Sequence, residues 1–123
     1  MRFLYAFVSW GIVALGTVHM LATLYLFKTL TGAALWFFSG GIAIALTGAL
    51  NLLHRAYGLS APGLRVVCVG TNVIMLAFGI VSGIASGAGI AEFALVLGLV
   101  GGAAVLSLSR SALARPANFT ESV

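Results

Sequence analysis

Charged side chains are scarce in this chain, and their scarcity restricts its class more than any other property. Only 7% of its 123 residues are charged and 62% are hydrophobic, and the mean hydropathy is +1.19. A soluble domain carries roughly 25% charged residues. A soluble fold of this length cannot cover its surface with so few charges, so we expect the protein to be solvated by lipid.

Cysteine and acidic residues are also rare. The one cysteine, Cys68, excludes an intrachain disulfide and a multi-cysteine metal site. Two acidic residues stand against six basic ones, but the basic residues lie at the ends of apolar runs, not in a patch with interleaved aromatics. We therefore expect no nucleic-acid partner. No catalytic or metal-ligand motif stands out, and we predict neither an enzyme nor a metal site.

The apolar residues form four runs, each long enough for a membrane-spanning helix. Short turns rich in Gly, Ser, Thr and Pro separate them. We predict an all-α bundle of four transmembrane helices with antiparallel neighbours, spanning about residues 2–27, 33–57, 62–85 and 90–108. The first run is too long for the apolar segment of a signal peptide, so we expect it to be a helix of the 1–108 membrane domain. Residues 109–123 form a polar tail that we expect to be disordered.

The basic residues predict an orientation. One side of the predicted bundle holds five arginines: Arg2, Arg55, Arg65, Arg110 and Arg115. The other side holds Lys28 and Glu92. Because cytoplasmic loops carry an excess of basic residues, we place both termini in the cytoplasm, with the protein in a bacterial inner membrane.

Polar residues share single faces of three predicted helices. Unpaired polar groups in hydrocarbon cost several kcal/mol each, so these faces should turn toward one another. Counting residues from the cytoplasmic helix ends predicts an inner polar layer of Asn51, Asn72, Arg55 and Arg65, with Cys68 nearby. We expect the asparagines to form an interhelical amide pair. The alternative is a cytoplasm-facing pocket for an anionic group.

The same counting predicts an outer layer of His19, Thr23, Trp36 and Glu92. A histidine well inside a lipid-embedded helix is a functional hypothesis by default, as a proton relay or a ligand for haem or a polar substrate. The structural alternative is a neutral imidazole hydrogen-bonded to a neighbour. Glu92 falls in the first turn of its helix, where the dipole favours a carboxylate, and its expected partner is His19 or Lys28.

Two histidines suggest a bis-histidine haem. The axial offset between His19 and His54 is on the order of 20 Å, which is too far for both to ligate one iron. We therefore expect no resident cofactor, and haem remains an option only through His19 residues of two subunits. We interpret His54 with Arg55 as the interfacial end of the second helix.

Small residues recur at four-residue spacing on the last two predicted helices. The stripe members are Gly79, Gly83, Gly87, Gly98 and Gly102. Such stripes let helix backbones approach closely in lipid. We expect them to pack within one bundle, with a homodimer interface on the third helix as the alternative.

The segments Ala34–Phe38 and Gly48–Leu53, with His19 in the preceding helix, give the chain a family likeness. It resembles small four-helix bacterial integral membrane proteins of uncharacterised function, over the first two helices. That resemblance implies no activity. The size is also similar to that of small multidrug transporters, but those carry a membrane-embedded glutamate in the first helix, and here the first helix has none.

The sequence favours a non-enzymatic accessory or structural membrane subunit, because each polar group has a packing role available to it. The alternative is a small dimeric transporter or ligand-binding protein that uses the outer layer. A third reading is a haem- or quinone-binding redox anchor that depends on His19. The expected partners are the lipid bilayer and either further copies of the chain or a larger membrane complex.

Overall fold

The computed structural model describes residues 1–113, which form four long helices and one short 3-10 helix. The elements are α1 (Arg2–Leu26), α2 (Gly32–Tyr57), α3 (Pro62–Ser86), α4 (Ile90–Leu108) and η1 (Arg110–Ala112). No strand occurs among these residues, and all four long helices are long and apolar enough to cross a membrane. The all-α prediction is confirmed for this part of the chain. Each long helix begins and ends within one residue of its predicted span.

Local sequence signals explain where the helices begin and end. The Thr31 hydroxyl accepts a hydrogen bond from the Ala34 backbone N–H at 3.2 Å, which caps the start of α2. Pro62 begins α3, where its missing N–H leaves no hydrogen bond unmade. Gly87 ends α3 with φ +65°, a left-handed conformation that favours glycine.

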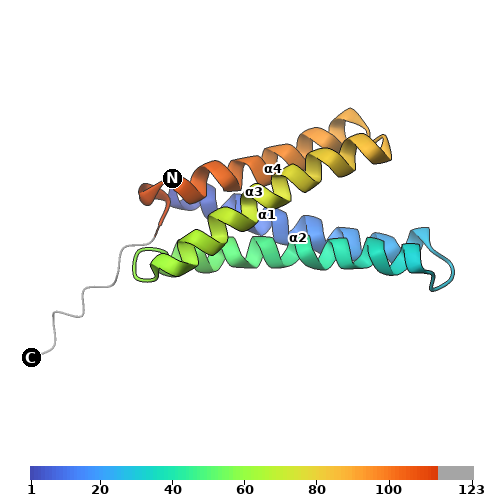
Figure 1. Cartoon of the computed structure of the whole chain (residues 1–123), viewed down its shortest axis with the longest axis horizontal. Helices are drawn as coiled ribbons and strands as arrows, with labels where there is room; N and C mark the ends of the chain where they lie inside the picture. The colour runs from blue at the N-terminus through green and yellow to red at the C-terminus, as the bar shows by residue number, and fades with distance from the viewer. Residues whose placement is uncertain (114–123) are drawn as a thin grey trace, which may run out of the picture.

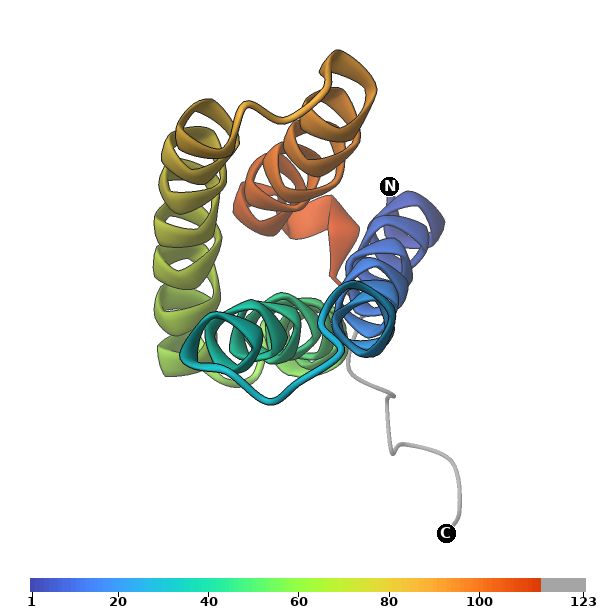
Figure 2. The ribbon, with the colours of Figure 1, turned by 90° about the vertical axis from the view of Figure 1, so that its right-hand side faces the viewer.

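The helices form two pairs that meet at one end and part at the other (Figure 1). α1 lies along α2 in the most extensively packed pair, and α3 lies along α4. The pairs meet where α1 begins, α2 ends, α3 begins and α4 ends, which we call the converging end. At the opposite, diverging end, the α3–α4 connection stands apart from the α1–α2 connection in both views (Figures 1 and 2).

Backbone contact holds α1 against α2. A Cβ atom added to Gly48 would lie 2.7 Å from the Val13 backbone nitrogen and 2.8 Å from the Ser9 carbonyl oxygen. One added to Gly41 would lie 2.9 Å from the Gly16 carbonyl oxygen. Real Cβ atoms do not approach backbone atoms so closely, so only glycine permits this helix separation.

The predicted glycine stripes on α3 and α4 do not bring those backbones together in the same way. Gly83 makes room for the ring of Phe93 on α4, so it faces a side chain and not a backbone. The other stripe members meet side chains no closer than 3.4 Å or have nothing within 4 Å: Gly79, Gly87, Gly98 and Gly102. The tightest helix contact is therefore between α1 and α2.

The segment after α4 departs from the predicted disordered tail. η1 packs against α1 and α4 at the converging end, and Ala112 and Leu113 are 0% and 1% exposed. They join an apolar core with α1 and α4 whose other buried members are Tyr5, Val8, Ile12, Ala103 and Leu106. The remainder of the predicted tail lies outside the described residues.

Candidate functional site

Five polar side chains meet inside the converging end. Tyr5 comes from α1, Asn51 and His54 from α2, and Cys68 and Asn72 from α3. Each is 0% exposed. We call this set the polar cluster, and it is the one place where hydrogen bonds between side chains join α1, α2 and α3 in the described part of the chain.

The two asparagines form a reciprocal amide pair. Asn51 Nδ2 donates to Asn72 Oδ1 at 2.8 Å, and Asn72 Nδ2 donates to Asn51 Oδ1 at 2.9 Å. The second Asn51 N–H donates to the Thr47 carbonyl at 2.8 Å, so both amide protons of that residue are used. This pattern fixes the Asn51 oxygen toward Tyr5 and Cys68, whose thiol lies 3.4 Å away.

Tyr5 links the amide pair to His54. Its hydroxyl lies 2.7 Å from Asn51 Oδ1 and 2.9 Å from His54 Nδ1. Asn51 Oδ1 can only accept, so the one hydroxyl proton of Tyr5 must be donated there. The His54 ring must then donate from Nδ1 to the Tyr5 oxygen. The hydrogen-bond network therefore requires a proton on Nδ1, so in a neutral imidazole Nε2 is the nitrogen without a proton.

The other nitrogen of His54 is unpaired. Nε2 is buried and has no hydrogen-bond partner among the described residues. A Cβ atom added to Gly58, the residue that ends α2, would lie 2.7 Å from Nε2 and 2.5 Å from the adjacent Cδ2. Gly58 therefore lies beside this edge of the ring, and a larger residue would clash with the ring and with the His54 carbonyl oxygen, which its Cβ would approach to 2.5 Å.

Two hydroxyl groups next to the polar cluster, on α1 and α2, donate hydrogen bonds to the backbone. Ser9 Oγ donates to the Tyr5 carbonyl at 2.6 Å, and Thr47 Oγ1 donates to the Ala43 carbonyl at 2.8 Å. Each hydroxyl thus donates its hydrogen bond to a carbonyl of its own helix.

The polar cluster contains one imidazole, one phenol and one thiol, and the phenol hydroxyl contacts the other two groups. Within residues 1–113 no three His, Cys, Asp or Glu side chains lie close enough together to hold a metal ion.

The predicted inner layer is brought together only in part. Asn51, Asn72 and Cys68 meet as predicted. The Arg65 guanidinium instead donates to the Leu108 carbonyl at 2.8 Å, which caps the end of α4. Arg55 is half-buried and has no hydrogen bond to the cluster in the part of the chain described. The arginines therefore do not complete an anion pocket with the asparagines.

The predicted outer layer is dispersed. The His19 ring stacks on Phe37 with ring centroids 3.9 Å apart, and Thr23 Oγ1 donates to the His19 carbonyl at 3.2 Å. Trp36 is 81% exposed, so it does not turn inward as the predicted outer layer requires. The buried polar face of α2 comprises Thr47, Asn51 and His54, nearer the end of the helix.

Glu92 lies away from the histidine. Its carboxylate accepts a hydrogen bond from the Gly89 backbone N–H at 3.3 Å, which caps the start of α4. The start of α4 is at the diverging end, on the helix pair that stands apart from α1 and α2 (Figure 1). The expected partnership of Glu92 with His19 or Lys28 is absent from residues 1–113.

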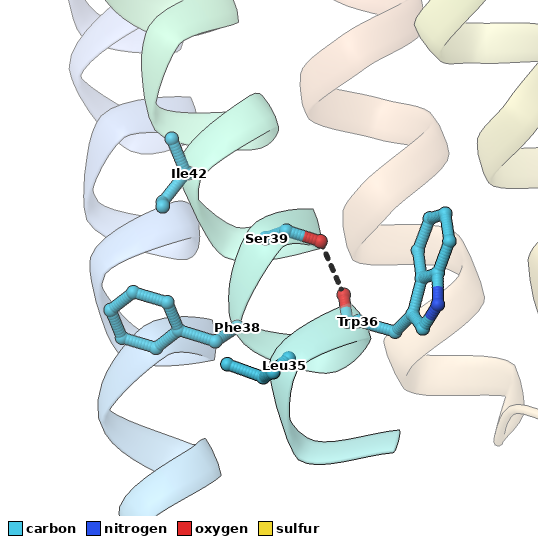
Figure 3. Close-up of a pocket in the computed structure, with 5 residues that line it drawn as sticks. All are labelled: Leu35, Trp36, Phe38, Ser39 and Ile42. Atoms are coloured by element: carbon cyan, nitrogen blue, oxygen red, sulfur yellow. Dashed lines mark hydrogen bonds between the residues drawn. The ribbon is translucent and has the colours of Figure 1, made fainter. Parts of the chain in front are cut away.

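A shallow apolar pocket of about 400 Å³ lies on α2 near the diverging end. Its lining residues are Leu35, Trp36, Phe38, Ser39 and Ile42, and Figure 3 shows the Trp36 and Phe38 rings projecting in opposite directions. The one hydroxyl there, Ser39 Oγ, donates to the Trp36 carbonyl at 2.8 Å. The pocket thus presents hydrocarbon to its surroundings and has no part in the polar cluster.

Sequence reasoning missed two members of the polar cluster. Tyr5 is an aromatic residue near a helix end, which is typical of the membrane interface, and the sequence predicts that His54 lies at the interfacial end of its helix. Both side chains are fully buried. A signal for Tyr5 exists: it lies four residues before Ser9, on the face of α1 that continues through Gly16 and Thr23. For His54 the signal is its three-residue spacing from Asn51 on the same helix face.

Comparisons of the chain with protein-family models, with curated proteins and with solved structures give no match. The geometry of the polar cluster and the arrangement of the helices are therefore what the functional proposal draws on.

Proposed function

We propose that this protein is an integral membrane protein with a structural, non-enzymatic role, as an accessory subunit of a membrane complex. The polar cluster is the observation that carries the proposal. Its five side chains come from three helices, are 0% exposed, and are joined to one another by hydrogen bonds. Groups used in this way hold helices together in lipid, where no hydrophobic force does so.

The exposed surface supports the same role. Large apolar side chains cover the outside of all four helices, and they suit contact with lipid or with the helices of a partner. A transporter that uses the outer layer needs His19 and Glu92 near one path. In this chain Glu92 caps its own helix and His19 stacks on Phe37, so the accessory role is favoured.

In the proposed arrangement, the four helices cross a bacterial inner membrane with antiparallel neighbours and both termini in the cytoplasm. The charges support this orientation, because Arg2, Arg55, Arg65 and Arg110 belong to the converging end while Lys28 follows α1 at the other. A C-terminal reporter that works only outside the cytoplasm should stay silent. A strong signal from it would reverse the orientation.

The test of function is purification of the chain from its native membrane in mild detergent, followed by mass and absorbance measurements. An accessory subunit should co-purify with a membrane partner at fixed stoichiometry. A homodimer without a partner would contradict the proposal, and a Soret band would favour the redox anchor that depends on His19.

Matched variants separate the accessory role from transport. His19→Ala and Glu92→Gln should leave partner co-purification intact, whereas Asn72→Ala should reduce it, because it breaks the amide pair inside the bundle. The opposite pattern supports a transporter: His19→Ala and Glu92→Gln abolish a growth or uptake phenotype at unchanged protein level. Quantitative blotting of the membranes supplies the protein level in each case.

A further inference from the structure

We propose that His54 is a proton-sensitive latch: the closed bundle accepts only its neutral imidazole, and protonation releases the α2–α3 connection at the converging end. The latch consists of His54, Tyr5 and Gly58. The inference goes beyond the accessory role, since it describes a conformational response of the bundle itself.

The neutral ring fits the closed bundle in one form only. Nδ1 donates to Tyr5, whose own proton goes to Asn51 at 2.7 Å. Nε2 then carries a lone pair, lies beside Gly58, and has no hydrogen-bond partner among residues 1–113. A lone pair needs no acceptor, so the neutral ring leaves no donor unpaired at this position.

Protonation places an N–H group at a position where no hydrogen-bond partner lies among residues 1–113. A buried donor without an acceptor loses its hydrogen bond to water and gains nothing in return. Either the new N–H stays unpaired or Gly58 moves away so that water reaches Nε2. Gly58 begins the short connection to Pro62, so its movement shifts the start of α3 as well.

Residues 1–113 place no carboxylate near the ring to compensate an imidazolium. At the converging end, the elements around His54 carry these titratable and charged groups: the Met1 amino group before α1, Arg2 and Tyr5 on α1, Arg55 and Tyr57 on α2, Arg65 and Cys68 on α3, and Arg110 on η1. The half of α4 at the converging end carries no titratable side chain. The one acidic residue among residues 1–113, Glu92, lies at the diverging end. A proton on His54 thus adds a positive charge to a region that already carries arginines and lacks carboxylates.

The chain contains its own reporter of latch opening. Cys68 is its one cysteine, is 0% exposed in the polar cluster, and lies 3.7 Å from the Tyr5 hydroxyl. A thiol reagent therefore reaches it only when the converging end opens. Movement of Gly58 and of the start of α3 uncovers this thiol.

The experiment measures the rate of Cys68 modification by a disulfide reagent in proteoliposomes, from about pH 7.5 to about pH 5, across the ordinary imidazole titration. Each rate is divided by that of the detergent-unfolded protein at the same pH, which removes the intrinsic reactivity of the thiol. We expect the ratio to rise tenfold or more on acidification. A constant ratio would overturn the latch.

The second histidine provides the matched control. The chain has two histidines, so His19→Gln removes one titrating imidazole and leaves His54 in place. The His19→Gln variant should keep the rise in labelling, and His54→Gln should abolish it. An equal rise in both variants would assign the pH response to another group and overturn the proposal.

A spectroscopic measurement covers the case in which His54→Gln does not fold. The His19→Gln protein carries a single histidine, so its ¹⁵N ring signals report His54 alone. At neutral pH they should show a protonated Nδ1 and an unprotonated Nε2. A proton on Nε2 in the folded protein at neutral pH would show that the closed bundle accepts an N–H group there. That result would overturn the latch.

Discussion

Replacing Tyr5 by phenylalanine is the sharpest test of the polar cluster. Tyr5→Phe keeps the ring that packs in the apolar core and removes one oxygen, so it leaves no large cavity. The lost hydroxyl donates to Asn51 Oδ1 at 2.7 Å and accepts from His54 Nδ1 at 2.9 Å. Asn51 Oδ1 keeps Asn72 as a donor at 2.9 Å, but His54 Nδ1 loses its acceptor.

The magnitude follows from that stranded donor. A buried donor without a partner costs about 1–3 kcal/mol, while an ordinary interhelical hydrogen bond in a membrane protein contributes ~0.6 kcal/mol. We expect the free energy of unfolding to fall by about 1–2 kcal/mol, in the lower part of the first range, because the ring can shift slightly. Unfolding in mixed micelles, followed by far-ultraviolet circular dichroism, measures this difference.

The other tyrosines supply the control. Tyr25 is 87% exposed and Tyr57 is 58% exposed, and neither side-chain hydroxyl has a hydrogen bond within residues 1–113. Tyr25→Phe and Tyr57→Phe should change the free energy of unfolding by less than about 0.5 kcal/mol. If Tyr5→Phe behaves like these two variants, the reasoning that the Tyr5 hydroxyl joins Asn51 and His54 inside a fully buried cluster is refuted.

The remaining predictions use the same unfolding assay. Gly16→Ala should destabilise by about 1–3 kcal/mol, because its Cβ would lie 2.7 Å from a carbonyl oxygen of α2; Gly98→Ala, with nothing within 4 Å, should stabilise by up to about 1 kcal/mol. Effects of the same sign would contradict the glycine contact between α1 and α2. Asn51→Ala and Asn72→Ala should be non-additive, with a coupling energy of at least ~0.6 kcal/mol in a double-mutant cycle, and additive effects would exclude the amide pair. Arg65→Gln should speed amide hydrogen exchange in η1, because it removes the cap on α4; unchanged exchange would show that η1 is held by its apolar contacts alone.

The helices and their boundaries were predictable because each boundary is a local event. A threonine cap, a proline at the first helical position and a left-handed glycine act within a few residues, and the apolar runs between them need only to be counted. The amide pair of Asn51 and Asn72 was predictable for a related reason. The depth of each asparagine follows from the rise per residue along its helix, and an unpaired amide in lipid costs several kcal/mol, so two amides at similar depth are expected to pair.

The outer layer was not predictable, because depth places residues at one level but does not say whether helices meet there. The two helix pairs part toward the diverging end (Figure 1). Glu92 on α4 therefore caps its own helix while His19 on α1 stacks on Phe37, although both belong to the predicted outer layer. The interpretation of His54 failed for the opposite reason. Its place near a helix end suggests the membrane surface, but the ring packs between Tyr5 on α1 and Gly58 after α2, and it is 0% exposed.

The hydrogen bonds of the polar cluster also set an order for biosynthesis. Tyr5 pairs with Asn51 and His54, and all three belong to the first two helices that leave the ribosome. The first hairpin can thus close on its own, with Gly16, Gly41 and Gly48 already in contact. Asn72 pairs with Asn51 of the first hairpin, so we expect the second hairpin to dock onto a first hairpin that has already closed.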